Sequence, residues 1–329
     1  MALGPTLITT KGQAASAVET AYTRARELCQ QEGDTPQLFL VLWGLWMYYG
    51  SRADNETAQE LAEQLMQLAE RLHDPALLPA AHFVLGWSFY CAGRLPPARE
   101  HYDQLIGLYD LDQHRSNVLR YGQDPSVIGL CMLAQTLQLL GYPDQAQRRF
   151  QEALSLAEEG THRYSHAFAM GWNGMHAYHR GEVQLAREYA ETAMAVSAEQ
   201  GFQLQAESGA IVCGLAKVGQ GQHEEGFSQL RQGLDGYRAI GAEISLTLFL
   251  ASLIGAYDQV GQAEEGLAVM TEALERVEKT GERYCEAELY RLKGELTLEK
   301  FKARPEQSRR VQGSKFKVQR RGRSGGMFS

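Results

Sequence analysis

The sequence predicts an all-α protein, an α-solenoid of antiparallel helix pairs that repeats about every 40 residues. A turn glycine followed five residues later by a small residue occurs five times, in steps of 48, 40, 40 and 40 residues. A second glycine series, with steps of 41, 40 and 40, follows amphipathic stretches and is typical of left-handed helix ends. Two such marks in each period indicate two helices per repeat. The turn pairs are Gly93/Ala98, Gly141/Ala146, Gly181/Ala186, Gly221/Gly226 and Gly261/Gly266.

The two glycine series predict the boundaries of the helices in chain order. We expect a short leader over 1–12, a repeat array over 13–299 and a basic, disordered tail over 300–329. The array begins with a lone helix at 13–31 and ends with a lone helix at 283–299. Between them we expect helix pairs at about 36–72, 76–109, 124–159, 163–200, 203–239 and 243–280.

Small residues mark the contacts inside each unit. In residues 78–109, Gly86 of the first helix and Ala98 of the second allow close approach, and Phe89, Tyr102 and Leu105 recur at helical spacing between them. An isolated pair cannot bury both of its faces, so the units must stack. In the final helix, Leu289, Leu292 and Leu296 are expected to form an apolar face that lacks a covering helix.

These slots resemble the tetratricopeptide repeat, which has a small residue at position 8 of helix A, a turn glycine, and alanine at position 20. The resemblance recurs in phase in about six units across residues 13–299. The usual repeat has about 34 residues, so the longer period here is similar to the long-repeat variants of bacterial regulators. The resemblance implies that the first helix of each pair lines the concave face.

Three segments carry a closer resemblance: LWGLWMYYGSRADNETAQELAEQLMQLAERLHDPALLPAAH, HRSNVLRYGQDPSV and EKTGERYCEAELYRLKGELTL. They resemble the C-terminal tetratricopeptide region of bacterial signalling proteins that carry a class III adenylate/guanylate cyclase domain and an AAA-type ATPase. Only the repeat part of that architecture is present, so cyclase and ATPase activities do not carry over. The resemblance implies a bacterial protein.

The sequence offers no catalytic centre that we recognise. There is no GxxxxGK[ST] phosphate loop, and the five scattered cysteines form no CxxC pair. We therefore expect neither an enzyme nor a cofactor. No run of 18 apolar residues occurs, and the segment MALGPTLITTKGQ lacks the features of a signal peptide. The interpretation is a cytoplasmic protein with no membrane partner.

The charge is unevenly distributed. Residues 300–329 carry ten Lys or Arg against one acidic residue, so the net charge of −8 leaves −17 on the remaining body. A body of that sign repels a phosphate backbone. Nucleic-acid binding is therefore unlikely, except weakly through the tail.

Two groups of polar residues are candidate binding sites. Four histidines, His162, His166, His176 and His179, fall on one predicted helix, but about 1.5 Å of rise per residue spreads them too far to share one ion, so no metal site is predicted. The 48-residue step adds a loop at 109–125, in which Arg115, Arg120 and Tyr121 could bind an anion. The alternative is that these arginines pair with nearby aspartates.

Positions 2, 5, 9 and 12 of each first helix predict the concave groove. The residues at these positions are Tyr48, Phe83, Trp87, Tyr90, Gln135, Gln138, Phe168, Met175 and Tyr178. Such an aromatic groove suits an apolar helix or extended segment. The alternative is that many of these aromatics belong to the core. We therefore predict a protein-interaction or regulatory scaffold for a peptide or protein partner of unknown identity. The other hypothesis is a non-catalytic fragment of a cyclase/ATPase signalling protein.

Overall fold

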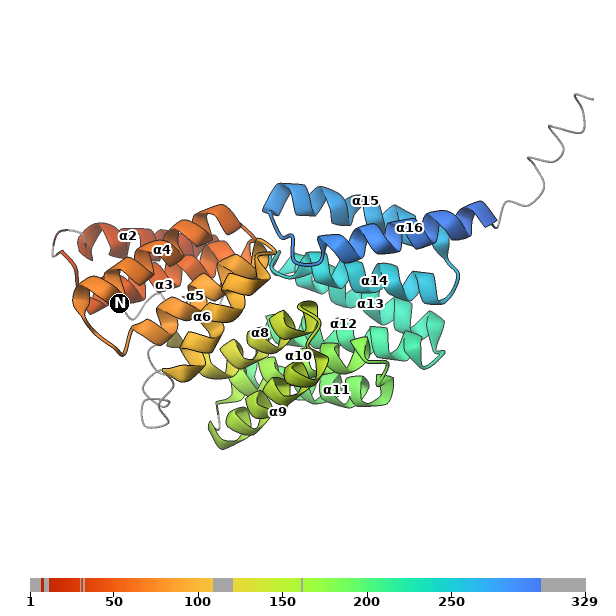
Figure 1. The fold of residues 1–329 in the computed structure, drawn as a ribbon, viewed down its shortest axis with the longest axis horizontal. Coiled ribbons are helices and arrows are strands. Elements are labelled where there is room, and N and C mark those ends of the chain that lie inside the picture. The colour runs from red at the N-terminus through yellow and green to blue at the C-terminus, as the bar shows by residue number, and fades with distance from the viewer. Residues whose placement is uncertain are drawn as a thin grey trace, which may run out of the picture.

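The computed structural model describes residues 7–8, 12–29, 31, 33–108, 121–160 and 162–302. Within these ranges the chain forms fourteen helices and no strand, which confirms the all-α prediction (Figure 1). The helices are α2 (Ser16–Cys29), α3 (Pro36–Ser51), α4 (Asn55–Leu72), α5 (Leu78–Cys91), α6 (Leu95–Gly107), α8 (Pro125–Leu139), α9 (Pro143–Gly160), α10 (Arg163–His179), α11 (Val183–Gln200), α12 (Gln203–Gly219), α13 (His223–Ala239), α14 (Leu246–Gln259), α15 (Ala263–Thr280) and α16 (Glu286–Lys302).

Left-handed glycines separate most of the helices where the sequence predicts them; the exception is Gly160, which lies inside α9. The turn glycines Gly181 and Gly221 have φ of 78° and 83°, and Gly201 ends α11 at φ 76°. Glycine adopts this conformation without the steric cost that a Cβ would impose. The turn glycines therefore fold each unit into an antiparallel pair.

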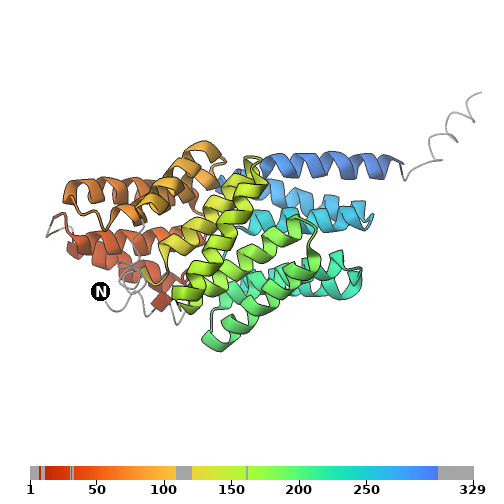
Figure 2. The same ribbon diagram turned by 60° about the horizontal axis from the view of Figure 1, so that its bottom comes forward.

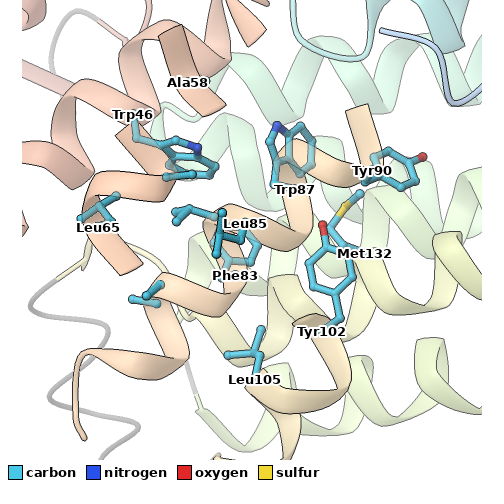
Figure 3. Packing of buried hydrophobic residues seen from close by; sticks show 14 of the residues in the cluster. Trp46, Ala58, Leu65, Phe83, Leu85, Trp87, Tyr90, Tyr102, Leu105 and Met132 are labelled. Atoms are coloured by element: carbon cyan, nitrogen blue, oxygen red, sulfur yellow. The ribbon is translucent and has the colours of Figure 1, made fainter. Parts of the chain in front are cut away.

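Close backbone approach inside the units explains the small residues. A Cβ on Gly86 would lie 2.8 Å from the ring of Tyr102, and one on Gly214 would lie 2.8 Å from the backbone nitrogen of Leu230. Ala98, on the second helix of its pair, is fully buried. Figure 3 shows the resulting interdigitation, with Phe83 and Tyr102 packed between neighbouring helices.

The superhelix closes on itself, which the sequence did not predict. The backbone carbonyl of Ser51, at the end of α3, accepts hydrogen bonds from Glu243 N and Ile244 N at 2.9 and 3.1 Å. The carbonyl of Cys91, at the end of α5, accepts one from Arg283 N at 2.7 Å. Helix ends leave such carbonyls without intrahelical partners, so the loops before α14 and α16 satisfy them. Figure 1 shows these loops against the ends of the first helices.

Side chains complete this closure. The ring of Tyr90 stacks on that of Tyr284 at 4.4 Å, and Asn55 Nδ2 donates to the carbonyl of Thr280 at 2.9 Å. Glu282 is buried, and its carboxylate accepts from Ser245 N at 2.9 Å and from the Thr247 hydroxyl at 2.7 Å. It thereby caps α14 from the loop before α16, where Ser245 itself supplies no side-chain cap.

The last helix differs from its prediction in two respects. Leu289, Leu292 and Leu296 are buried, so the prediction that they form an uncovered face is wrong. Leu296 packs on Gly266 of α15, because the preceding unit supplies the cover. In addition, α16 extends to Lys302, into the segment that we predicted as tail. Figure 2 shows α16, in dark blue, along the edge of the C-terminal half.

Candidate functional site: an uncharged chamber inside the superhelix

Because the superhelix closes, its concave face becomes a chamber rather than an open groove. The chamber has a volume of about 110 Å³ and is lined by side chains of α3, α5, α8, α10, α12 and α14, the first helices of successive units. Eight aromatic side chains line it: Trp46, Phe83, Trp87, Tyr164, Phe168, Trp172, Tyr237 and Phe249. In Figure 3 the indoles of Trp46 and Trp87 lie beside each other above Phe83.

The chamber wall carries no charge. Among the described residues that line it there is no Asp, Glu, Lys, Arg or His, and the polar side-chain groups are those of glutamine, serine and tyrosine and the indole N–H of tryptophan. Burying an unpaired charge against such a wall would be costly. The chamber therefore favours an apolar, uncharged occupant.

A wider mouth adjoins the chamber. It has a volume of about 790 Å³ and is lined by α2, by α3 and by the turns before α8, α10, α12 and α14. Gln13, Gln123, Tyr164 and Gln205 line both spaces. Gln205 Nε2 donates to the hydroxyl of Tyr164 at 3.1 Å, which fixes both side chains at the boundary between the two spaces. The two adjoining spaces are thus a narrow apolar chamber and a wider, more polar pocket, which is here called the mouth.

Of the nine predicted groove residues, Phe83, Trp87, Phe168 and Met175 line the chamber. The other five do not, and for them the expected register needs correction. Tyr90 and Tyr178 are buried, Tyr48 packs on the ring of Tyr49 at 5.1 Å, Gln135 is buried within α8, and Gln138 Oε1 lies 2.7 Å from His176 Nδ1.

The spacing of the chamber residues along one helix shows where the predicted register holds. In α10 the chamber side advances through Tyr164, Phe168, Trp172 and Met175, in steps of four and three residues. Phe168, Trp172 and Met175 keep the spacing of positions 5, 9 and 12, whereas Tyr178 lies one step beyond position 12. Trp46, Met47, Tyr164, Trp172 and Gln205 also line the chamber but are not among the predicted groove residues. The 40-residue spacing of Tyr164, Leu204 and Ile244, all chamber residues, is a signal that could have found the chamber side.

Two of the four candidate histidines, His162 and His176, hydrogen-bond to protein side chains or backbone. His162 caps α10, where its side chain accepts from Ser165 N. His176 lies between Gln138 Oε1 and Gln147 Oε1, at 2.7 and 2.8 Å, and burial lowers its pKa to about 4. Across the described ranges, no group of three or more His, Cys, Asp or Glu side chains could hold a metal ion.

The predicted anion-binding loop is only partly visible. Arg115 and Arg120 lie outside the described residues. Tyr121 is buried at the mouth, with its ring 4.8 Å from that of Trp43. Its position is therefore that of an aromatic wall residue.

Comparison with known proteins gives a consistent picture of the fold. No family model matches the sequence. An uncharacterised protein of Rhizobium meliloti (strain 1021) is 24% identical over 302 residues, which cover 90% of this chain. The chain spans 29% of that relative's length.

Among solved structures, a Rap protein complexed with competence and sporulation factor has the same fold, with a TM-score of 0.60 and 15% identity. The match covers 90% of this chain and 84% of the Rap chain. This chain is a helical-repeat protein. The apo form of RapI gives a TM-score of 0.47 at 12% identity, with coverage of 87% and 82%. Within the described part of this helical-repeat protein, no helix is both long and apolar enough to cross a membrane.

Proposed function

We propose that the chain is a protein-interaction module that anchors an uncharged, apolar side chain of a peptide or protein partner in the chamber. The observation that carries this proposal is that no charged side chain occurs among the described residues of an aromatic wall that adjoins a wider mouth. Interaction anchors are commonly large apolar side chains in desolvated pockets.

The two volumes suggest how a partner would divide between them. An engineered cavity of about 150 Å³ holds a benzene molecule, so a chamber of about 110 Å³ suits a single apolar side chain. The mouth, about 790 Å³, is within the size range of ligand sites and can take an extended segment. An intact helix is about 10 Å wide with its side chains, too wide for the chamber. We therefore favour an extended segment.

The Rap protein of similar fold was solved with competence and sporulation factor bound. At 15% identity this likeness supports the fold directly and a bound partner only by analogy. The wall chemistry of this chain carries the proposal independently of that analogy.

Tryptophan fluorescence offers the test. Three of the four tryptophans, Trp46, Trp87 and Trp172, line the chamber, so an occupant should change their emission. Short peptides with a central Leu or Phe should bind, and matched peptides with a central Asp or Lys should bind at least about tenfold more weakly, a difference of about 1.4 kcal/mol. Equal binding of both sets would contradict the proposal.

A filled chamber provides the matched variant. Gly171 lines the chamber and a Cβ there would meet nothing within 4 Å, so Gly171→Leu should occupy the space without a clash. It should abolish peptide binding and leave the thermal stability intact, since leucine favours helix over glycine. The control is Gly255→Leu, at another helical glycine with open space that does not line the chamber. Undiminished binding by Gly171→Leu would place the partner elsewhere.

A second candidate function is supported by a different observation. We propose, as the alternative, that the chain corresponds to the non-catalytic repeat region of a cyclase/ATPase signalling protein, which three of its segments resemble. Its Rhizobium meliloti relative is a longer protein. Purified chain should then neither hydrolyse ATP nor form cyclic nucleotide. Turnover that a point substitution in this chain removes would contradict this.

A further inference from the structure

Helix α16 is apolar on two opposite faces. Leu289, Leu292 and Leu296 are buried against the array, whereas Tyr290, Leu298 and Phe301 are 56%, 60% and 80% exposed. The exposed set follows helical spacing through Gly294, in steps of four, four and three residues. The other large exposed hydrophobic residues of the described chain each stand on a different segment. Tyr290, Gly294, Leu298 and Phe301 are named here the α16 stripe.

The repeat shows what normally covers this face. Eighty residues earlier, the equivalent positions in α12 are Ala210, Gly214 and Val218. All three contact α13: a Cβ on Gly214 would lie 2.9 Å from the carbonyl oxygen of Gly226, and one on Gly226 would lie 2.7 Å from Val218. Ala210 lies within 3.3 Å of the Cβ position of Gly233. In α12, the face equivalent to the stripe is therefore covered by the second helix of the same unit.

At α16, none of the described residues covers that face. A Cβ on Gly294 would meet nothing within 4 Å, whereas the equivalent Gly174 and Gly214 each face helix backbone at about the distance of contact. A glycine at the centre of an apolar stripe permits two helices to approach closely. The stripe therefore has the shape for another helix.

We propose that the occupant is α16 of a second copy of this chain, packed antiparallel across Gly294. The charges favour this arrangement. The helix begins with Glu286 and Glu288 and ends with Lys300 and Lys302, so antiparallel packing sets acidic ends against basic ends. Parallel packing would instead place like charges together. A two-fold contact of this kind is self-complementary and closes as a dimer.

The expected dimer is weak. At about 1.5 Å per residue, the 17 residues of α16 form one short helix pair. Such a pair buries less area than the roughly 1,200–2,000 Å² of stable interfaces. Sedimentation of the full chain should therefore show a monomer–dimer equilibrium across the micromolar range. A monomer at every concentration would overturn the proposal.

Two substitutions locate the interface. Leu298→Glu and Gly294→Glu should each weaken dimerisation by at least about tenfold without lowering the melting temperature, because both sites face open space. Leu185→Glu, at an exposed leucine on α11, is the matched control and should leave the dimer unchanged. A dimer that survives both stripe substitutions overturns the proposal. So does a melting temperature lowered by several degrees, since it would mean that a segment of the same chain covers the stripe.

Charge reversal tests the orientation. Glu288 and Lys302 flank the same side of the stripe, so antiparallel packing brings Lys302 of one copy near Glu288 of the other. Lys302→Glu should weaken the dimer, and the double variant with Glu288→Lys should restore it. Failure of this rescue would exclude the antiparallel arrangement.

Discussion

Replacement of Glu282 tests whether closure of the superhelix stabilises the fold. Its buried carboxylate accepts from Ser245 N and from the Thr247 hydroxyl, so Glu282→Ala leaves two donors without their partner. A buried donor left unsatisfied costs about 1–3 kcal/mol. Burial also raises the pKa of Glu282, which shows that the ionised carboxylate is itself partly penalised in the fold. Allowing for that offset, we expect a loss of about 2–4 kcal/mol.

Urea unfolding followed by two signals would measure this loss. Circular dichroism reports all helices, whereas the four tryptophans lie between residues 43 and 172 and report only the first half of the array. Because closure joins α14 to α3, Glu282→Ala should shift the tryptophan transition as well, although residue 282 lies far along the chain. Glu282→Gln, which keeps an acceptor and can rearrange towards Thr247, should cost less than about 1 kcal/mol.

Two outcomes would refute this reasoning. A cost below about 0.5 kcal/mol for Glu282→Ala, typical of a surface substitution, would mean that the cap contributes little. A loss seen by dichroism alone, with the tryptophan transition unchanged, would mean that the two ends unfold independently, as in an open array. The exposed Glu278, paired with Arg283 at 3.6 Å, supplies the control substitution Glu278→Ala.

Further predictions concern helix contacts and pH. Gly214→Ala should destabilise the fold by about 1–3 kcal/mol, because the added Cβ would overlap the backbone of α13. Gly255→Ala should stabilise the fold by up to about 1 kcal/mol, because a Cβ there meets open space. The urea midpoints of the two variants measure both effects. The Nδ1 atoms of His82 and His101 are 3.0 Å apart. Burial and the neighbouring His101 lower the pKa of His82 to about 4. The unfolded side chain titrates near 6.5, so it binds a proton that the folded state does not. Stability should therefore fall as the pH drops from about 6.5 towards 4, and His82→Gln should reduce that slope in melting curves; an unchanged slope would contradict the assignment.

The helices could be predicted from the sequence because the residues that mark their ends and contacts act locally. A turn glycine such as Gly181 needs only its own backbone conformation, and Gly214 needs only the helix that follows it. Both the turn glycine and the small contact residue recur every 40 residues, and this recurrence distinguishes the repeat from a chance match. The paired helices consequently lie within a few residues of their predicted ranges.

The chamber could be predicted only in part because its register depends on contacts between units. Phe83, Trp87, Phe168 and Met175 follow from the choice of the inner helix. Tyr90 does not, since it is withdrawn from the concave side by stacking on Tyr284, a residue almost two hundred positions away. No pattern within one repeat encodes that contact. The covered face of Leu292 has the same origin, because the cover belongs to another unit.

Closure also constrains how such a chain can change its length. An open solenoid can gain or lose a unit by duplication or deletion, since each repeat contacts only its neighbours. Here the carbonyls of Ser51 and Cys91 are bonded to the loops before α14 and α16, and these bonds require a fixed rise between the two ends. One added helix pair would carry the loops past their acceptors and leave Glu282 facing a different helix. Duplication of a helix pair between α5 and α14 should thus be tolerated poorly.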